Sequence, residues 1–432
     1  MADICLSTRD PRCCFEAMPF NRHSPGESDV TLDVSYCGVC HSDVHTAKND
    51  LMHTVYPVCP GHEIAGVVTA VGAKVSKVKI GDHVGVGCMV DACLECGPCK
   101  RGDEQFCTKG MTGTYSSEPK HGRAGTESTK GGYCSKMVVH EHFVISVPKS
   151  VPLEVAGPIL CAGVTMFAPL KKYKVGPHSR VGINGLGGLG TMGVKLAKAM
   201  GAHVTVITRS ARKEAQARAA GADEVIISSD AASVKAAALS LDLVVDTVSV
   251  RHDIQVNALA PGGLVDVLDV DGVWCYTGLI LDMQDVQVAR LLMKQNSLTG
   301  TMIGGIALTQ ECVDFCALHK IYPECELVDA SPAELSRVYE MLDAGNDSGL
   351  RYVLDIGKTL NEASFQLPRP RAPKLLGRSR LVAQIALLLN RMALSKIESV
   401  VLERSSLIAG FLGATLVAGV GLVALPLLRR MH

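Results

Sequence analysis

Four cysteines stand close together in one short segment of this 432-residue chain. Cys93, Cys96, Cys99 and Cys107 are separated by two, two and seven residues. A structural zinc ion takes four tetrahedral ligands, and this spacing lets one lobe supply four thiolates. Unrelated buried cysteines and an iron–sulfur cluster are the alternatives, although iron–sulfur motifs are spaced differently and usually end in Cys-Pro. The segment therefore predicts a structural zinc site.

A second set of possible zinc ligands is spread along the chain. Cys40 lies in GVCHSDVH (38–45), His62 in PGHEIAGVV (60–68) and Cys161 in LCAGVT (160–165). A catalytic zinc ion requires about three protein ligands and an open position for a substrate oxygen. Asp43 could bind the other ring nitrogen of a histidine ligand. Taken singly, such a cysteine or histidine is more often a core residue, so residue type alone leaves both interpretations open.

A glycine-rich stretch predicts a nucleotide site. It comprises Gly185, Leu186, Gly187, Gly188, Leu189 and Gly190, between an expected strand over 180–184 and an expected helix over 191–200. Glycines at this spacing permit a tight turn and let a pyrophosphate approach the helix N-terminus. The alternative is a glycine-rich turn that binds no cofactor.

The end of the next expected strand, 203–208, indicates which cofactor binds. An NAD enzyme carries Asp or Glu about 20 residues after the glycines, where it binds the ribose 2′-hydroxyl. This chain has Thr208, Arg209 and Ser210 there, followed by Lys213. Hydroxyls and cations bind a 2′-phosphate, which a carboxylate would repel, so the segment favours NADP(H). The alternative is a solvated helix start with incidental basic residues.

These residues need a scaffold in which strands and helices alternate. The first third of the chain is rich in strands and loops, with strands expected over 30–36 and 64–71 and no long helix before about residue 151. Further strands are expected over 225–228 and 241–246, and helices over 212–220, 309–319 and 332–344. This alternation predicts an α/β fold with a doubly wound parallel sheet covered by helices on both faces.

Composition narrows the functional class. Lysine plus arginine equals aspartate plus glutamate, 43 each, so no overall charge favours nucleic acid. Residues 1–20 carry several charges and no apolar run, which excludes a secretory signal. The 17 cysteines are therefore expected in a reducing compartment, where clustered cysteines usually serve metal binding or catalysis.

The C-terminal part differs in kind from the rest. Residues 367–404 form a proline-rich linker and a basic amphipathic segment, and residues 405–428 contain no charged side chain. A run of about 24 uncharged residues is long enough to cross a bilayer as a helix. It predicts a transmembrane tail anchor in an organelle membrane, with the enzyme facing the cytoplasm. The alternative is an apolar helix that docks on the enzyme or at an oligomer interface.

The motifs together resemble the zinc-dependent medium-chain dehydrogenase/reductase family, in particular its cinnamyl alcohol dehydrogenase-type branch. The resemblance covers roughly residues 15–360. It is carried by the motifs already quoted, together with Gly131-Gly132-Tyr133, GLGGLGTMGVKLAKAMGAHVTVI (185–207) and TGTMIGG (299–305).

The resemblance implies a fold and a set of site residues. A GroES-like, β-rich catalytic domain would comprise residues 1–157 and 297–366, around a Rossmann-type domain over 158–296, in a homodimer. Cys40, His62 and Cys161 would hold the catalytic zinc, with Glu63 beside it and Ser42 and His45 in a proton relay. The implied cofactor-contacting residues are His41, Thr165, Gly185, Leu186, Gly187, Gly188, Leu189, Gly190, Thr208, Arg209, Ser210 and Lys213.

The implied reaction is hydride transfer between NADP(H) and a primary alcohol or aldehyde, with two zinc ions per chain. Zinc would polarise the carbonyl, NADPH would donate hydride, and Ser42 would relay a proton. A polyol dehydrogenase of the same family is one alternative. A non-catalytic, membrane-tethered reductase-like module is another, although the retained catalytic ligands argue against it.

Overall fold

The computed structural model describes residues 3–125, 127–252, 254, 263–281, 288–345 and 349–360. The predicted linker, basic segment and transmembrane helix over 367–428 lie outside these residues. Among the residues described, Leu153–Lys172 is long and apolar enough to cross a membrane, and 83% of its most apolar window is buried. That burial identifies the stretch as a core helix of this fold.

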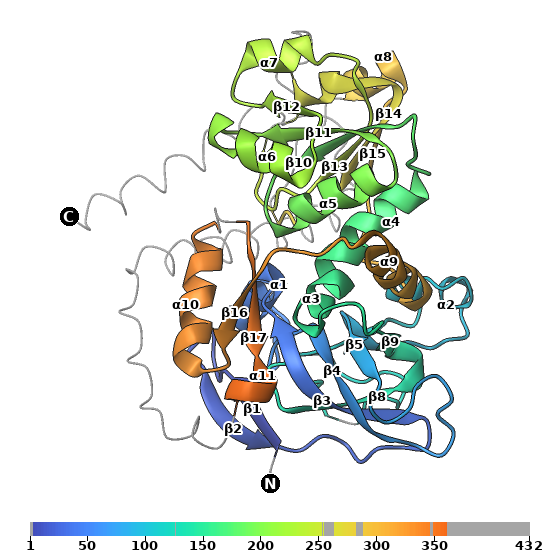
Figure 1. Ribbon diagram of the computed structural model, residues 1–432, viewed down its shortest axis with the longest axis vertical. Coiled ribbons are helices and arrows are strands. Elements are labelled where there is room, and N and C mark those ends of the chain that lie inside the picture. Colours follow the sequence, from blue (N-terminus) through green and yellow to red (C-terminus); the bar gives the residue numbers. More distant parts are fainter. Residues whose placement is uncertain are drawn as a thin grey trace, which may run out of the picture. The chain divides into compact units, whose positions relative to one another are not determined.

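A six-stranded parallel sheet contains the predicted nucleotide motif (Figure 1). Its strands in spatial order are β12 (Glu224–Ile227), β11 (His203–Thr208), β10 (Arg180–Asn184), β13 (Leu241–Asp246), β14 (Leu268–Tyr276) and β15 (Ser297–Gly300). The order reverses between β10 and β13, and ligands of doubly wound sheets bind at the carboxyl ends of strands at such a switch point. The predicted parallel sheet is therefore confirmed.

A seven-stranded mixed sheet joins the two ends of the described chain. Its path runs β16 (Cys325–Asp329), β17 (Arg351–Asp355), β3 (Asp29–Gly38), β4 (Glu63–Val71), β5 (His83–Val86) and β9 (Ile145–Ser146), with β8 (Lys136–His140) paired to β3. The orange β17 thus lies beside the blue β3 in Figure 1. The first and last thirds of the described chain therefore build one sheet, as the GroES-like reading requires.

The remaining elements connect these sheets. Two small two-stranded antiparallel sheets pair β1 (Asp3–Ser7) with β2 (Glu16–Phe20) and β6 (Met89–Asp91) with β7 (Thr112–Gly113). The helices are α1 (His41–Ala47), α2 (Gly97–Lys100), α3 (Leu153–Pro158), α4 (Val164–Lys172), α5 (Gly188–Ala199), α6 (Glu214–Ala220), α7 (Ala231–Ala236), α8 (Val288–Lys294), α9 (Ile306–His319), α10 (Pro332–Asp343) and α11 (Ile356–Thr359). Short turns η1 (Glu104–Phe106), η2 (Glu141–Phe143), η3 (Ile159–Gly163), η4 (Ala211–Lys213) and η5 (Leu264–Val267) complete the described chain.

Two helix starts differ from expectation. The helix expected over 191–200 begins at Gly188, because glycines in the loop also take helical conformation there. The helix expected over 212–220 is divided into η4 and α6, and the Ser210 side chain caps η4 by accepting from the Arg212 amide. Seven further helices, of four to nine residues each, were not predicted, because such short segments show little helical periodicity. They are α1, α2, α3, α4, α7, α8 and α11.

Candidate zinc centres and cofactor loop

The three predicted ligands of the catalytic zinc meet in one buried cluster. Cys40, His62, Glu63 and Cys161 place their ligand atoms within 4.8 Å of one another. The sulfurs of Cys40 and Cys161 lie 3.9 Å apart, and Nε2 of His62 is 3.1 Å from the Cys161 sulfur. Two thiolates bound about 2.3 Å from one tetrahedral ion would be about 3.8 Å apart, so this donor set fits zinc.

Strand pairing brings two of these ligands together. Gly38 ends β3 and pairs with Glu63 at the start of β4. Cys40 and His62 therefore both lie just beyond this last pair of the antiparallel ladder, at the same end. A Cβ atom at Gly38 would lie 2.0 Å from a Glu63 carboxylate oxygen, which explains the glycine. Cys161 comes from η3, a turn of π-helix between α3 and α4. Such turns are frequent at functional sites, where they re-aim a side chain.

Asp43 orients the histidine ligand. Its Oδ1 lies 3.0 Å from Nδ1 of His62, while the Cys40 amide and the Tyr133 hydroxyl donate to its Oδ2 at 2.8 and 2.9 Å. The side chain is fully buried. A carboxylate that holds Nδ1–H leaves the Nε2 lone pair free for a metal. The hydroxyl of Tyr115 also lies 3.2 Å from Nδ1. Sequence reasoning found Asp43 and missed the contacts of both tyrosines.

A buried ion pair closes the other side of the cluster. Arg351 of β17 places Nη2 2.9 Å from Oε1 of Glu63, and both side chains are buried. Burial raises the pKa of Glu63 to about 7, against the attraction of Arg351. Apart from this ion pair, neither Glu63 oxygen accepts a hydrogen bond within the described chain, which is an arrangement that suits a neighbouring metal ion. Sequence reasoning missed Arg351, because nothing near it in the chain points to this site.

The predicted proton relay lies on α1. The Ser42 hydroxyl is 3.7 Å from the Cys40 sulfur, so it stands at the edge of the metal cluster, and its side chain is exposed. One turn further on, the His45 ring stacks on His41 with centroids 4.8 Å apart. Nδ1 of His45 lies 2.8 Å from a carboxylate oxygen of Asp50. The helix thus leads from the cluster to polar, partly exposed groups.

The four-cysteine segment forms the second cluster. Cys93, Cys96, Cys99 and Cys107 also lie with their sulfurs within 4.8 Å, including 3.8 Å from Cys93 to Cys99. Backbone amides of Cys93 and Cys96 point at the sulfurs of Cys107 and Cys93, at 3.4 and 3.3 Å. Backbone amide donors lower the pKa of Cys96 to about 5. Four thiolates held by local backbone fit a closed zinc site.

The glycine loop leaves room for a close ligand. Gly185 has a φ of +91°, in the left-handed region that glycine adopts without strain. A Cβ atom at Gly190 would lie 2.0 Å from the Gly185 carbonyl, whereas one at Gly187 would meet nothing within 4 Å. The loop is therefore closely packed between Gly185 and Gly190 and leaves free space beside Gly187. The N-terminus of the twelve-residue α5 follows it. This arrangement fits a pyrophosphate.

The predicted 2′-phosphate residues surround the end of β11. Thr208 is buried at the strand end, Arg209 is exposed, and Ser210 is half-buried. The Lys213 ammonium reaches back to the Leu186 carbonyl of the glycine loop at 3.4 Å. Lys213 therefore joins two segments that a dinucleotide would span. Leu189 lies in the first turn of α5, and Thr165 is buried in the first turn of α4, close in sequence to Cys161.

Comparisons with known proteins agree with this geometry. Residues 26–149 match the alcohol dehydrogenase GroES-like domain, and residues 188–317 match the zinc-binding dehydrogenase model. NADP-dependent alcohol dehydrogenase C of Mycobacterium tuberculosis is 44% identical over 335 residues, covering 78% of this chain and 93% of that protein. Aldehyde reductase YahK of Escherichia coli is 42% identical over 354 residues, covering 80% and 96%.

Solved structures give the same result. A cinnamyl alcohol dehydrogenase from Sorghum bicolor superposes with a TM-score of 0.77 and 37% identity, covering 83% of this chain and 99% of that one. CAD from Helicobacter pylori, solved in complex with NADP(H), has a TM-score of 0.74 and 37% identity over the same shares.

Proposed function

Because the chain belongs to the zinc-dependent medium-chain dehydrogenase/reductase family, among the NADP-dependent alcohol dehydrogenases and aldehyde reductases, we propose that Cys40, His62 and Cys161 hold its catalytic zinc. We assign the structural zinc to the cluster of Cys93, Cys96, Cys99 and Cys107. The meeting of three ligands from three distant segments, next to an Asp43-oriented histidine, is the observation that carries this assignment.

The side chains divide the work of the reaction. Zinc, when bound, supplies a Lewis acid for the substrate oxygen, and NADP(H) supplies or accepts the hydride. Asp43 keeps the Nδ1 proton on His62, so that Nε2 remains a ligand. Ser42, at the edge of the cluster, moves a proton to or from the substrate oxygen. His45, whose Nδ1 lies 2.8 Å from a carboxylate oxygen of Asp50, carries that proton toward solvent.

The cofactor residues are proposed from position and charge. Lys213 and Arg209 would pair with the 2′-phosphate of NADPH, while the backbone of Gly187 and Gly188 would approach the pyrophosphate. Lys213→Glu should lower the preference for NADPH over NADH, in kcat/KM, by at least tenfold, about 1.4 kcal/mol. Lys235→Glu, on exposed α7, is the matched control and should leave the preference unchanged. An unchanged preference in Lys213→Glu would remove this residue from the site.

A substrate panel tests the activity itself. Aromatic and aliphatic aldehydes, with sorbitol as a polyol, should be assayed with NADPH or NADP. Turnover of aldehydes supports the main assignment, and turnover confined to polyols would favour a polyol dehydrogenase. A zinc-loaded protein without turnover of either class would instead support a non-catalytic module.

We propose a homodimer from the exposed edge of the six-stranded sheet. β15 is the last strand in the sheet order, and the adjoining α8 exposes Leu292 and Met293, at 74% and 81%. Open strand edges and apolar patches favour association. Met293→Glu should shift the mass measured by light scattering toward the monomer. Met52→Glu, a similarly exposed methionine on another surface, should not.

We further propose a cytoplasmic-facing enzyme tethered by its tail. This proposal depends on the sequence alone, namely the uncharged run over 405–428 and the many cysteines that need a reducing compartment. The full chain should pellet with membranes and resist carbonate extraction. Truncation after Leu367 should release a soluble enzyme with unchanged turnover. Full-length protein in the soluble fraction would favour the docked-helix alternative.

A further inference from the structure

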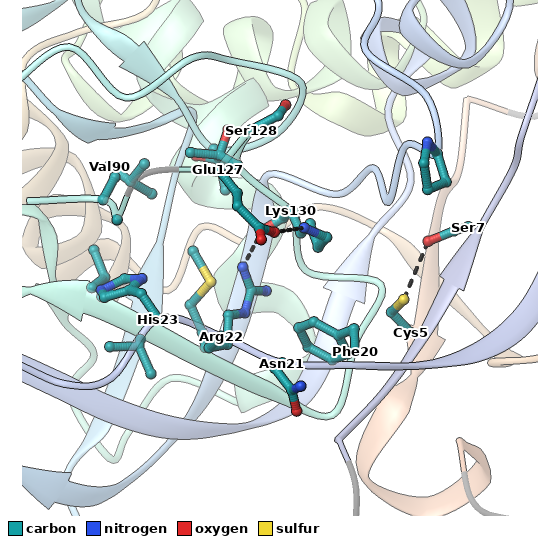
Figure 2. A pocket seen from close by; sticks show the side chains of 18 of the residues that line it. Cys5, Ser7, Phe20, Asn21, Arg22, His23, Val90, Glu127, Ser128 and Lys130 are labelled. Carbon is teal, nitrogen blue, oxygen red and sulfur yellow. Dashed lines mark hydrogen bonds and ion pairs between the residues drawn. The ribbon is translucent and has the colours of Figure 1, made fainter. Parts of the chain in front are cut away.

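A cavity of about 450 Å³ lies apart from the zinc centres and the cofactor loop. Among the described residues, those that line it include none of the predicted zinc ligands or cofactor contacts. Cys5, Arg22 and Lys130 are among its lining side chains, as Figure 2 shows. Cys5 thus presents a thiol at a cavity that the dehydrogenase reaction does not use.

Cys134 stands directly opposite Cys5 in an isolated antiparallel bridge. The Leu6 amide donates to the Tyr133 carbonyl at 2.8 Å, and the Ser135 amide donates to the Ile4 carbonyl at 2.9 Å. This pattern identifies a non-hydrogen-bonded pair, whose Cα atoms stand about 4.5 Å apart with side chains on the same face. That separation is within the range of about 4.4–6.8 Å found in disulfides. A bridge between the two sulfurs therefore needs no backbone movement.

A third cysteine, Cys59, is less well placed for bridging. Its neighbour Val58 pairs with Thr8 on the same edge of β1 that pairs with residues 133–135, and the Cys59 carbonyl accepts from the Gly131 amide. Among the described residues, strand pairing places Cys134, and not Cys59, opposite Cys5. Cys59 instead donates a hydrogen bond to the Cys5 sulfur.

The surroundings make the three thiols unequal. The hydrogen bond from Cys59 lowers the pKa of Cys5, and the charges of Arg22 and Lys130 act in the same direction. Burial raises the pKa of both Cys59 and Cys134. Because the thiolate is the reactive form, Cys5 is the thiol that attacks first.

We propose that Cys5 and Cys134 are a redox-active pair, in which a hydroperoxide in the cavity oxidises Cys5 and Cys134 then closes a disulfide. The Cys5 sulfur attacks one peroxide oxygen, the O–O bond breaks, and a sulfenic acid forms as the peroxide is reduced. The Cys134 sulfur attacks that sulfenic sulfur, so the S–S bond forms and the S–O bond breaks. With hydrogen peroxide, two thiols and one peroxide give one disulfide and two waters. A dithiol reverses the reaction.

The pair is linked to the catalytic zinc ligands through Tyr133 and Asp43. Cys134 follows Tyr133, whose hydroxyl donates to Asp43, the residue that orients His62. The disulfide would join Cys134 to Cys5 of β1 without changing the backbone arrangement around either residue. Turnover should therefore stay within about twofold after oxidation, whereas oxidation of the zinc thiolates would release metal and abolish turnover.

Peptide mapping of the zinc-loaded, full-length protein tests the proposal. Trypsin places Cys5, Cys134 and Cys59 in separate peptides, residues 1–9, 131–136 and 49–74, each with one cysteine. After brief treatment with hydrogen peroxide and blocking of free thiols, the peptide 1–9 should be found linked to 131–136. Dithiothreitol should remove the link. A metallochromic dye should report no zinc release at that dose.

Two variants separate the roles within the pair. In Cys134→Ser, Cys5 should stop at the sulfenic acid and be trapped by dimedone. Cys325→Ser, a half-buried cysteine elsewhere, is the control and should form the link as the parent does. A link from Cys5 to Cys59 in the parent protein would overturn the assignment. Oxidation of the zinc ligands before any Cys5 link appears would overturn it as well.

Discussion

The two candidate zinc centres use the same sulfur ligands but are assembled in different ways. The four-cysteine lobe takes all its ligands from residues 93–107, and local backbone amides point at its sulfurs. The catalytic cluster takes Cys40, His62 and Cys161 from three segments, which the pairing of β3 with β4 and the π-turn η3 bring together. A locally built site suits a structural role. A site built across the fold depends on every element that meets there, and can keep a position open for substrate.

The largest expected effect is the loss of turnover in Cys161→Ala. Removing one of three ligands should release the catalytic zinc and lower kcat/KM by about 10³-fold or more. A Lewis acid stabilises the transition state by several kcal/mol, and each 1.4 kcal/mol or so corresponds to about tenfold in rate. Metal analysis should still find the lobe zinc, and circular dichroism should show a folded chain.

Cys316→Ala is the control for that experiment, because it removes another fully buried cysteine from α9. It should keep both zinc ions and its turnover. Loss of both ions from Cys161→Ala would show that the two centres are not independent.

The second effect is on stability, in Cys99→Ala. The lobe should lose its zinc while the catalytic ion remains. The free energy of unfolding should fall by about 3 kcal/mol, which is only part of what a structural zinc ion can contribute. Such a fall would lower Tm by roughly 6–12 °C. The fall in kcat should be less than tenfold. The lobe also supports α9, because Glu104 accepts from the Ile306 amide at 3.0 Å.

Differential scanning calorimetry with and without chelator measures this change. Cys325→Ala, a half-buried cysteine outside both clusters, should leave Tm nearly unchanged. A variant Cys99→Ala that retains Tm but loses turnover would reverse the roles assigned to the two centres.

The smallest expected effect comes from Asp43→Asn. The amide keeps the shape of the side chain but loses the charge that holds Nδ1–H of His62, so the catalytic site should bind zinc about 10–100-fold more weakly. Competition with a chromogenic chelator measures the affinity of each centre. Asp50→Asn, which changes only the exposed partner of His45, is the control. Equal weakening at both centres would contradict the proposed role of Asp43.

The sequence predicted the local features of the molecule well. The spacing of Cys93 to Cys107 was sufficient for the lobe, since all four ligands lie within one short loop. The glycine stretch after β10 and the strands β10, β11, β12 and β13 were also predicted, because turn residues and apolar runs act over a few neighbours, whereas β14 was not. Cys40, His62 and Cys161 were single residues with ordinary alternatives, and only the family resemblance joined them.

The sequence by itself thus determined the local ligand spacing, the alternation of strands and helices, and the absence of an acidic residue after β11. The tertiary structure decided which distant groups meet. Arg351 reaches Glu63 because β17 pairs with β3, where Val353 lies opposite Gly38, the same residue that pairs with Glu63. Cys134 stands opposite Cys5 in the same way, and the neighbouring Tyr133 donates to Asp43 of α1. Such contacts depend on strand register across the chain, and one residue of slip would turn each side chain to the other face.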